Sequence, residues 1–303
     1  MTEPRPQMSG PDDGVVEALE GPATAGSASL AKRKKKPNFR MVFGGALIFL
    51  VVFIALFAPF LATHDPLELG TQRLASPGRD HLFGTDQFGR DVFSRVMYGS
   101  RTSLIVGSAT VILSTVFGTV IGLLAGFYRR VDGIIMRAMD AFMAFPSILL
   151  AIAIMAALGP NPRNVVIALT ITYTPRTARV VRGKVLGVRE EAYVESARAI
   201  GLGDIKILRS YILVNVLAPL MVQATFILAL AIIAEAGLSY IGAGTPPPTP
   251  SWGNILSDGR AVLSVAPWMT TFPGVFIMVS VLGLNILGDG LRDVLDPRLK
   301  DVQ

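Results

Sequence analysis

The sequence predicts an all-α, polytopic membrane protein with six transmembrane helices. Hydrophobic residues make up 51% of the 303 residues and charged residues only 17%, whereas a soluble domain is about one-quarter charged. The mean hydropathy is +0.53, and several uncharged runs reach the roughly 20 residues that a helix needs to cross a bilayer. These observations exclude a soluble enzyme. The net charge of +6 is a topology signal rather than a nucleic-acid-binding surface, because the basic residues lie beside apolar runs.

Residues 1–36 are expected to form a disordered cytoplasmic tail. They are rich in Gly, Pro, Ser and Ala and end in five basic residues at 32–36, so they cannot bury a core. A basic stretch before an apolar run is also typical of a signal peptide. The apolar run that follows is too long for one, so 37–63 is predicted as an uncleaved first transmembrane helix.

Five uncharged runs can each hold a transmembrane helix, and they lie at 41–63, 102–128, 141–162, 210–234 and 261–288. A sixth candidate at 164–175 is long enough only if the helix continues past Arg176 and Arg179, whose side chains can snorkel to the interface. With six spans and a cytoplasmic N-terminus, the inside segments contain 21 of the 28 Lys and Arg residues. This bias favours six spans with both ends in the cytoplasm. Five of the spans fall in a core domain at 102–291, which a cytoplasmic tail at 292–303 follows.

Two external segments are predicted to be structured. The loop at 64–101 contains a Gly-rich turn followed by a short interfacial helix, because the apolar residues between 92 and 97 fall on one helical face. The segment at 245–260 contains a Pro-rich run that favours a stiff polyproline II conformation.

Gly118, Gly122 and Gly126 form a stripe of small residues on the second predicted span. Small residues every four positions allow another helix backbone to approach closely in lipid. Close helix packing is the favoured interpretation, and a gate hinge is the alternative.

Two polar residues in the apolar runs are candidates for a role inside the membrane. Glu235 directly follows the apolar run at 210–234, where a carboxylate in lipid costs about 2–3 kcal/mol. It is expected either to be hydrated at the outer boundary or to face the bundle interior, where it would contact a cationic group or close a gate. Asn285 lies one turn before Asp289 and is expected to form a hydrogen bond between helices.

The composition argues against chemistry performed by this chain. There is no Cys, and with two His and no clustered ligands no metal site is predicted. No Gly-x-x-x-x-Gly-Lys-Ser/Thr phosphate loop occurs, so any ATP that drives the protein is hydrolysed by another chain.

Two other membrane functions remain as alternatives. An intramembrane aspartyl protease would need two facing carboxylates, for which Asp140 and Asp289 are the candidates. Asp140 follows Arg137 by three residues, which favours a helical ion pair instead. A self-sufficient secondary transporter would show an internal repeat and ionisable residues within its spans, and neither is evident.

The loop at 181–210 carries many charges between two apolar segments. Glu191 and Glu195 precede the basic residues, as suits a helix dipole, and Gly201 and Gly203 are typical of a helix C-terminus. Two short helices joined at a Gly turn are therefore predicted. On charge alone, a solvated inside loop is an equally good interpretation.

The run from Glu195 through Ala197 to Gly201 resembles the EAA loop of ABC-importer permeases, in which a Glu-x-Ala-x-x-x-Gly core precedes a basic helix. Four further blocks, at 81–104, 132–146, 237–254 and 285–298, are similar to inner-membrane permeases of the dipeptide/oligopeptide (DppC/OppC) type. The resemblance covers about residues 36–300. Ser196 stands where the family has Ala, and Leu213-Val214 replaces the usual Leu-Pro, which predicts a softer helix break.

This resemblance implies the fold of a type I ABC importer permease and a non-catalytic transport subunit of a prokaryotic inner membrane. The implied partners are a homologous second permease subunit, two ATPase subunits that hold ATP and Mg²⁺, an extracytoplasmic solute-binding protein and a di- or oligopeptide substrate. No cofactor is expected on this chain, and no nucleic acid. Nickel complexes, glutathione or another small solute are alternative substrates.

The resemblance also implies roles for individual residues. Contact with an ATPase is expected at Glu191, Glu195, Ser196, Ala197 and Gly201. A translocation path or gate is expected at Glu235 and Asn285. Docking of the binding protein is expected within 81–101 and 245–260, at Asp86, Arg90, Asp91 and Trp252.

Overall fold

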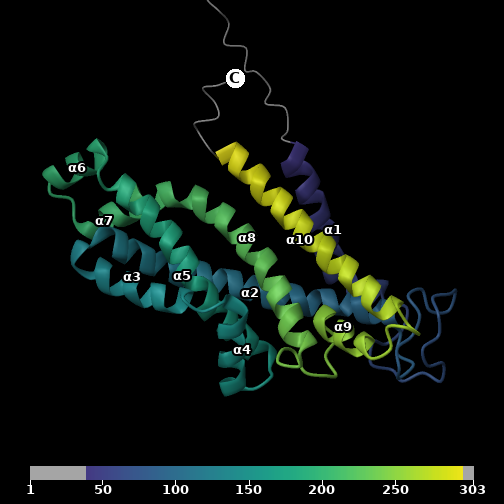
Figure 1. The fold of residues 1–303 in the computed structure, drawn as a ribbon. Coiled ribbons are helices and arrows are strands. Elements are labelled where there is room, and N and C mark those ends of the chain that lie inside the picture. Colours follow the sequence, from purple (N-terminus) through teal and green to yellow (C-terminus); the bar gives the residue numbers. More distant parts are fainter. Residues whose placement is uncertain (1–38, 296–303) are drawn as a thin grey trace, which may run out of the picture. The chain divides into compact units, whose positions relative to one another are not determined.

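The computed structural model describes residues 39–295, and within them the chain is helical, with one isolated β-bridge between Thr85 and Asp91. In chain order the elements are α1 (Phe39–Leu61), α2 (Val92–Phe127), α3 (Arg129–Met143), α4 (Ser147–Leu158), α5 (Pro162–Val188), α6 (Ala192–Ala199), α7 (Asp204–Ile207), the π-helix η1 (Leu208–Ile212), α8 (Leu213–Tyr240), α9 (Trp252–Arg260) and α10 (Trp268–Leu295) (Figure 1). The predicted tail at 1–36 and the end of the tail at 292–303 lie outside the described residues.

The structure confirms a polytopic all-α fold, in which four to five of the six predicted spans are recognised from helix length and apolar composition. Four helical segments are long and apolar enough to cross a membrane: α1, α2, α10 and the run Asp204–Tyr240. The pair α3 and α4, bent by 88°, would make a fifth. The predicted span within α5 is not among them, since Arg176, Arg179 and Arg182 make its second half polar.

The second predicted span is longer than the sequence indicated. The predicted interfacial helix and the span that follows it form one 36-residue helix, Val92–Phe127, so the prediction of two separate elements is wrong. Asp91 caps this helix by accepting a hydrogen bond from the Ser94 amide at 2.8 Å, and Gly99 packs against Trp252 instead of ending the helix. At 1.5 Å per residue α2 is about 54 Å long, which exceeds the roughly 30 Å hydrocarbon core.

The glycine stripe on α2 is a packing surface, as predicted. A Cβ atom on Gly118 would lie 2.4 Å from Thr177 Cβ, and one on Gly126 would lie 2.6 Å from Val185 Cβ. Such distances are impossible, so α2 and α5 pack backbone against side chain with no room for a larger residue. The helix continues unbroken through the stripe, which gives no support to a hinge there.

Three apolar clusters hold the helices together. The first surrounds Trp252 where α2, α9 and α10 meet, and the second lies between α4, α5 and α8. The third joins the ends of α2 and α5 to α6, α7 and the start of α8. The helices of the first cluster and those of the third cluster meet at opposite ends of α2 (Figure 1). The segments 62–91 and 241–267 lie at the Trp252 end of α2, and together we call them the cap.

Candidate functional site

The 181–210 loop contains the predicted pair of short helices. Helix α6 ends before Gly201, whose φ of +80° lies in the left-handed region that favours glycine. The Gly201 amide donates to Arg198 O at 2.9 Å and the Leu202 amide donates to Ala197 O at 3.1 Å. These bonds close the end of the helix in a left-handed cap and turn the chain toward α7.

One face of α6 is buried and the other is open. Val194 and Ala197 pack into the third apolar cluster, whereas Glu191, Glu195 and Ser196 are exposed. The five residues predicted to contact an ATPase therefore differ in position. Ala197 packs the helix against the third apolar cluster, whereas the other four lie on its outer surface: Glu191, Glu195, Ser196 and Gly201.

Two isoleucines beside this surface were missed by the sequence analysis. Ile200 is 76% exposed and Ile205 is 80% exposed, one on each side of the Gly201 turn. Neither side chain packs into the third apolar cluster, so both lie on the outer surface of the loop. The sequence did not single them out, because the same loop contains other apolar residues, such as Val194 and Ile207, that pack inward.

The base of the loop is fixed by ion pairs and hydrogen bonds. Arg182 forms a bidentate pair with Asp132, at 2.5 and 2.6 Å, which joins α5 to α3. Arg189 donates to the last-turn carbonyl of Gly126 at 2.7 Å, which joins the end of α5 to the end of α2. Hydrogen bonds from Arg189 and Arg129 hold the pKa of Glu190 below its ordinary value. The exposed helix is thus attached to a base in which α2, α3 and α5 are joined to one another.

The two aspartates considered for proteolysis do not form a site. Asp140 pairs with Arg179 on α5 at 2.5 Å, not with Arg137 as predicted, because Arg179 reaches it across the helix interface. The Asp140 side chain is 60% exposed and Asp289 is exposed. Neither is the buried carboxylate that an intramembrane protease requires.

Glu235 faces the interior and is fully buried, which rules out the hydrated-boundary interpretation. Ser103 on α2 donates to its Oε2 at 2.8 Å, and Ser239 donates to its Oε1 at 2.8 Å. Thr245 lies 3.5 Å from Oε1. Its partners are hydroxyl groups, not the predicted cation, so the carboxylate ties α2, α8 and the cap together.

Asn285 is half-buried on α10. Its side chain forms no hydrogen bond within residues 39–295, so the predicted bond between helices is absent. A role in a path or gate stays a prediction.

The cap contains a buried cluster of two acidic and two basic residues. Asp86 accepts from Arg90 Nε at 2.6 Å and from Arg95 Nη1 at 2.5 Å. Asp258 on α9 accepts from the second guanidinium nitrogen of each, at 3.2 and 3.0 Å. The four charges sum to zero, as burial requires. The sequence analysis missed Arg95 and Asp258, since the second lies far along the chain.

The four predicted docking residues are internal to the cap. Asp86, Arg90, Asp91 and Trp252 are 0%, 9%, 2% and 0% exposed. Trp252 donates its indole N–H to the Val96 carbonyl at 3.1 Å. Their prediction as direct contacts for a partner is wrong, because the same charges that suggested a binding surface neutralise one another or cap α2.

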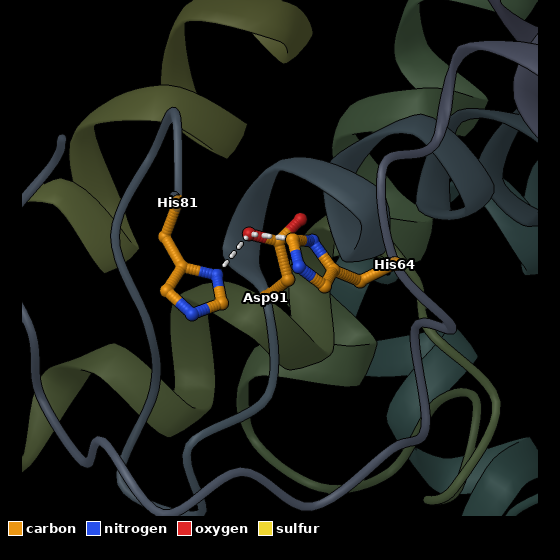
Figure 2. A group of neighbouring side chains, drawn as sticks. All are labelled: His64, His81 and Asp91. Carbon is orange, nitrogen blue, oxygen red and sulfur yellow. Dashed lines mark hydrogen bonds and ion pairs between the residues drawn. The ribbon is translucent and has the colours of Figure 1, made fainter. Parts of the chain in front are cut away.

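The structure also brings together the two histidines, contrary to the prediction of no clustered ligands. His64 follows α1, His81 lies in the 62–91 loop, and both approach the Asp91 carboxylate (Figure 2). His81 Nδ1 lies 2.9 Å from Asp91 Oδ1, and His64 Nδ1 lies 3.9 Å from the same oxygen.

Comparison with known proteins places this geometry in context. The family described as the inner membrane component of binding-protein-dependent transport systems matches residues 118–301. A putative peptide transport system permease protein of Brucella suis is 50% identical over 88% of this chain and 90% of its own length. A dipeptide transport system permease protein of Alkalihalophilus pseudofirmus is 46% identical over 89% of this chain and 90% of its own. A glutathione transport system permease protein of Pectobacterium atrosepticum is 42% identical over 86% and 87%.

Proposed function

The chain belongs to the family of inner membrane components of binding-protein-dependent transport systems, and we propose that it is the permease subunit of an ATP-driven importer of di- or oligopeptides. The observation that carries the proposal is an exposed helix, α6, on a base fixed to the ends of α2, α3 and α5. Relatives named for peptide and dipeptide transport, similar over most of both chains, support the substrate class.

Helix α6 and the Gly201 turn form the surface that a separate ATPase subunit would bind. Glu191 and Glu195 offer carboxylates to basic side chains, and Ile200 and Ile205 offer apolar anchors on either side of the turn. ATP and Mg²⁺ would be held by the ATPase subunits. Their closure would bind one arrangement of the permease more tightly than the other, and that difference in affinity would drive the conformational change.

The orientation follows from α2 and from the distribution of charge. At about 54 Å, α2 reaches past both faces of the hydrocarbon core, with α6 at one end and the cap at the other (Figure 1). The basic residues at the α6 end support a cytoplasmic location for it, in line with the positive-inside rule. The cap then faces outward, and both chain ends lie in the cytoplasm of a prokaryotic cell.

The remaining partners are a homologous second permease subunit and an extracytoplasmic solute-binding protein. Since Asp86, Arg90 and Asp91 are internal, we infer that the binding protein contacts the exposed residues of the cap, among them the apolar side chains of Leu69, Leu82 and Phe88. The relative named for glutathione transport favours one alternative substrate, a small peptide-like solute such as glutathione.

The Gly201→Trp variant tests the coupling role. A Cβ at Gly201 would meet no atom within 4 Å, so the indole projects outward, where an ATPase would bind. Gly201→Ala is the matched control, because it imposes a similar backbone strain of about 1–2 kcal/mol without the bulk. We expect Gly201→Trp to insert normally but to lose co-purification with the ATPase or peptide-driven uptake, while Gly201→Ala retains most of both. Normal assembly and uptake in Gly201→Trp would refute the role.

A further inference from the structure

Three metal-ligating side chains converge in the cap from segments that are separate along the chain. His64 follows the end of α1, His81 lies in the middle of the 62–91 loop, and Asp91 precedes α2 (Figure 2). One ligand atom from each lies within 4.8 Å of the other two. Figure 2 shows the two imidazole rings on opposite sides of the Asp91 carboxylate.

The distances suit a small divalent cation. A tetrahedral Zn²⁺ with bonds of about 2.0–2.1 Å has ligand atoms about 3.3 Å apart. The separations of 2.9 and 3.9 Å between Asp91 Oδ1 and the two imidazole nitrogens lie on either side of that value. The separation between the two imidazole nitrogens is at most 4.8 Å, so binding would require the rings to move toward each other by up to about 1.5 Å to reach the tetrahedral spacing.

The hydrogen bonds of Asp91 leave one of its carboxylate oxygens facing the two histidines. Its Oδ2 accepts the Ser94 amide at 2.8 Å in capping α2, which leaves Oδ1 for the two histidines. The distance from His64 Nδ1 to Oδ1 is too long for a hydrogen bond, and this ring nitrogen lies 3.0 Å from the Thr63 hydroxyl. His81 Nδ1 forms a hydrogen bond with Asp91 Oδ1 at 2.9 Å, and a cation would replace that bond with bonds to both imidazoles and the carboxylate.

The cluster is accessible from water and lies in an acidic cavity. A cavity of about 220 Å³ is lined by all three residues together with Asp65 and Glu68. The side chains of His64 and His81 are 39% and 18% exposed, whereas Asp91 is 1% exposed. A cation could therefore enter from solvent and keep a water ligand at the open position.

We propose that His64, His81 and Asp91 form a binding site for one divalent transition-metal cation of the Zn²⁺ class. Two imidazoles and one carboxylate are ligands that Zn²⁺ accepts readily. The ion would join the end of α1 to the start of α2, and it would stabilise the folded cap because the unfolded chain does not hold the three ligands together. The proposal is independent of the transport function.

The test is Zn²⁺ binding to the full chain assembled with its partner subunits, purified with a tag that contains no histidine. After metal is removed with a chelator, Zn²⁺ is titrated in competition with a chromophoric chelator. We expect the wild-type complex to bind one more Zn²⁺ per copy of this chain than the His64→Ala complex, or to bind it at least about tenfold more tightly. Zn²⁺ that binds to the partner subunits is the same in both complexes, so it drops out of the difference between wild type and His64→Ala.

Two further variants keep the test decisive. Glu68→Gln changes an acidic residue of the same cavity outside the three ligands, and it should keep the site. His81→Ala should lose the site, with Co²⁺ substitution giving a tetrahedral absorption band in wild type only. Equal Zn²⁺ binding by wild type and His64→Ala would overturn the proposal, as would the absence of any site in wild type, whether or not His81→Ala folds.

Discussion

The four-charge cluster of the cap gives a prediction with a control inside the same chain. Asp86 and Asp140 each pair with an arginine at 2.5 Å. The Asp86 and Arg95 side chains are 0% and 3% exposed, whereas those of Asp140 and Arg179 are 60% and 51% exposed. The two pairs therefore separate the effect of burial from the effect of distance.

Asp86→Asn keeps the size and one acceptor oxygen of the side chain but removes its charge. Arg90 and Arg95 would then share Asp258 alone, which leaves one uncompensated positive charge in a buried site. Breaking a buried ion pair in this way costs about 3–5 kcal/mol, whereas an exposed pair contributes about 0–1 kcal/mol. For a chain of this size the buried change corresponds to a fall in Tm on the order of 10 °C.

The measurement is thermal unfolding of the detergent-solubilised complex, with wild type, Asp86→Asn and Asp140→Asn compared in one buffer. We expect a large fall in Tm for Asp86→Asn and a shift of at most a few degrees for Asp140→Asn. Equal shifts in the two variants would show that burial does not decide the strength of these pairs.

Three shorter predictions test other contacts. Gly122→Leu should prevent the α2–α5 contact and abolish stable expression, because its Cβ would lie 2.6 Å from a backbone oxygen; Gly183→Leu, whose Cβ meets nothing within 4 Å, should express normally. Glu235→Leu should lower stability by about 1–3 kcal/mol in thermal unfolding, because the Ser103 hydroxyl loses its buried acceptor, and Glu235→Gln should be milder. The pKa of Glu190 is lowered by two guanidinium groups, so its contribution to stability is present at neutral pH and lost as pH falls through its folded-state pKa; the Tm difference between wild type and Glu190→Gln should disappear at acidic pH.

Local features of the fold were predictable from the sequence. The turn at Gly201 follows from a glycine after a helical pattern, and the glycine stripe follows from a repeat of four on one helix. Both depend on residues within a few positions of one another. The continuous α2 was missed because apolar runs define the part of a helix in lipid, and nothing in the sequence marks how far the helix continues beyond it.

The internal organisation of the cap was not predictable in the same way. Asp86 and Arg90 are polar residues in a Gly-rich loop, a pattern that fits an exposed surface as well as a buried cluster. The outcome depends on Asp258, which the fold brings to them from α9. His64 and His81 meet at Asp91 for the same reason, since only the path of the 62–91 loop brings them together.

The contacts of α2 limit where the protein can bend during transport. The glycine stripe packs α2 closely against α5. Arg189 at the end of α5 donates a hydrogen bond to the Gly126 carbonyl at the end of α2. Helix α6 rests on that same end through the third apolar cluster. These three helices therefore move together, and a displacement of α6 by an ATPase would be carried along α2 to the cap. We expect bending where the chain departs from regular α-helix, as at the 88° break between α3 and α4 and at the π-helix η1 between α7 and α8. The π-helix ends directly before Leu213-Val214, where the resemblance predicted a softer helix break.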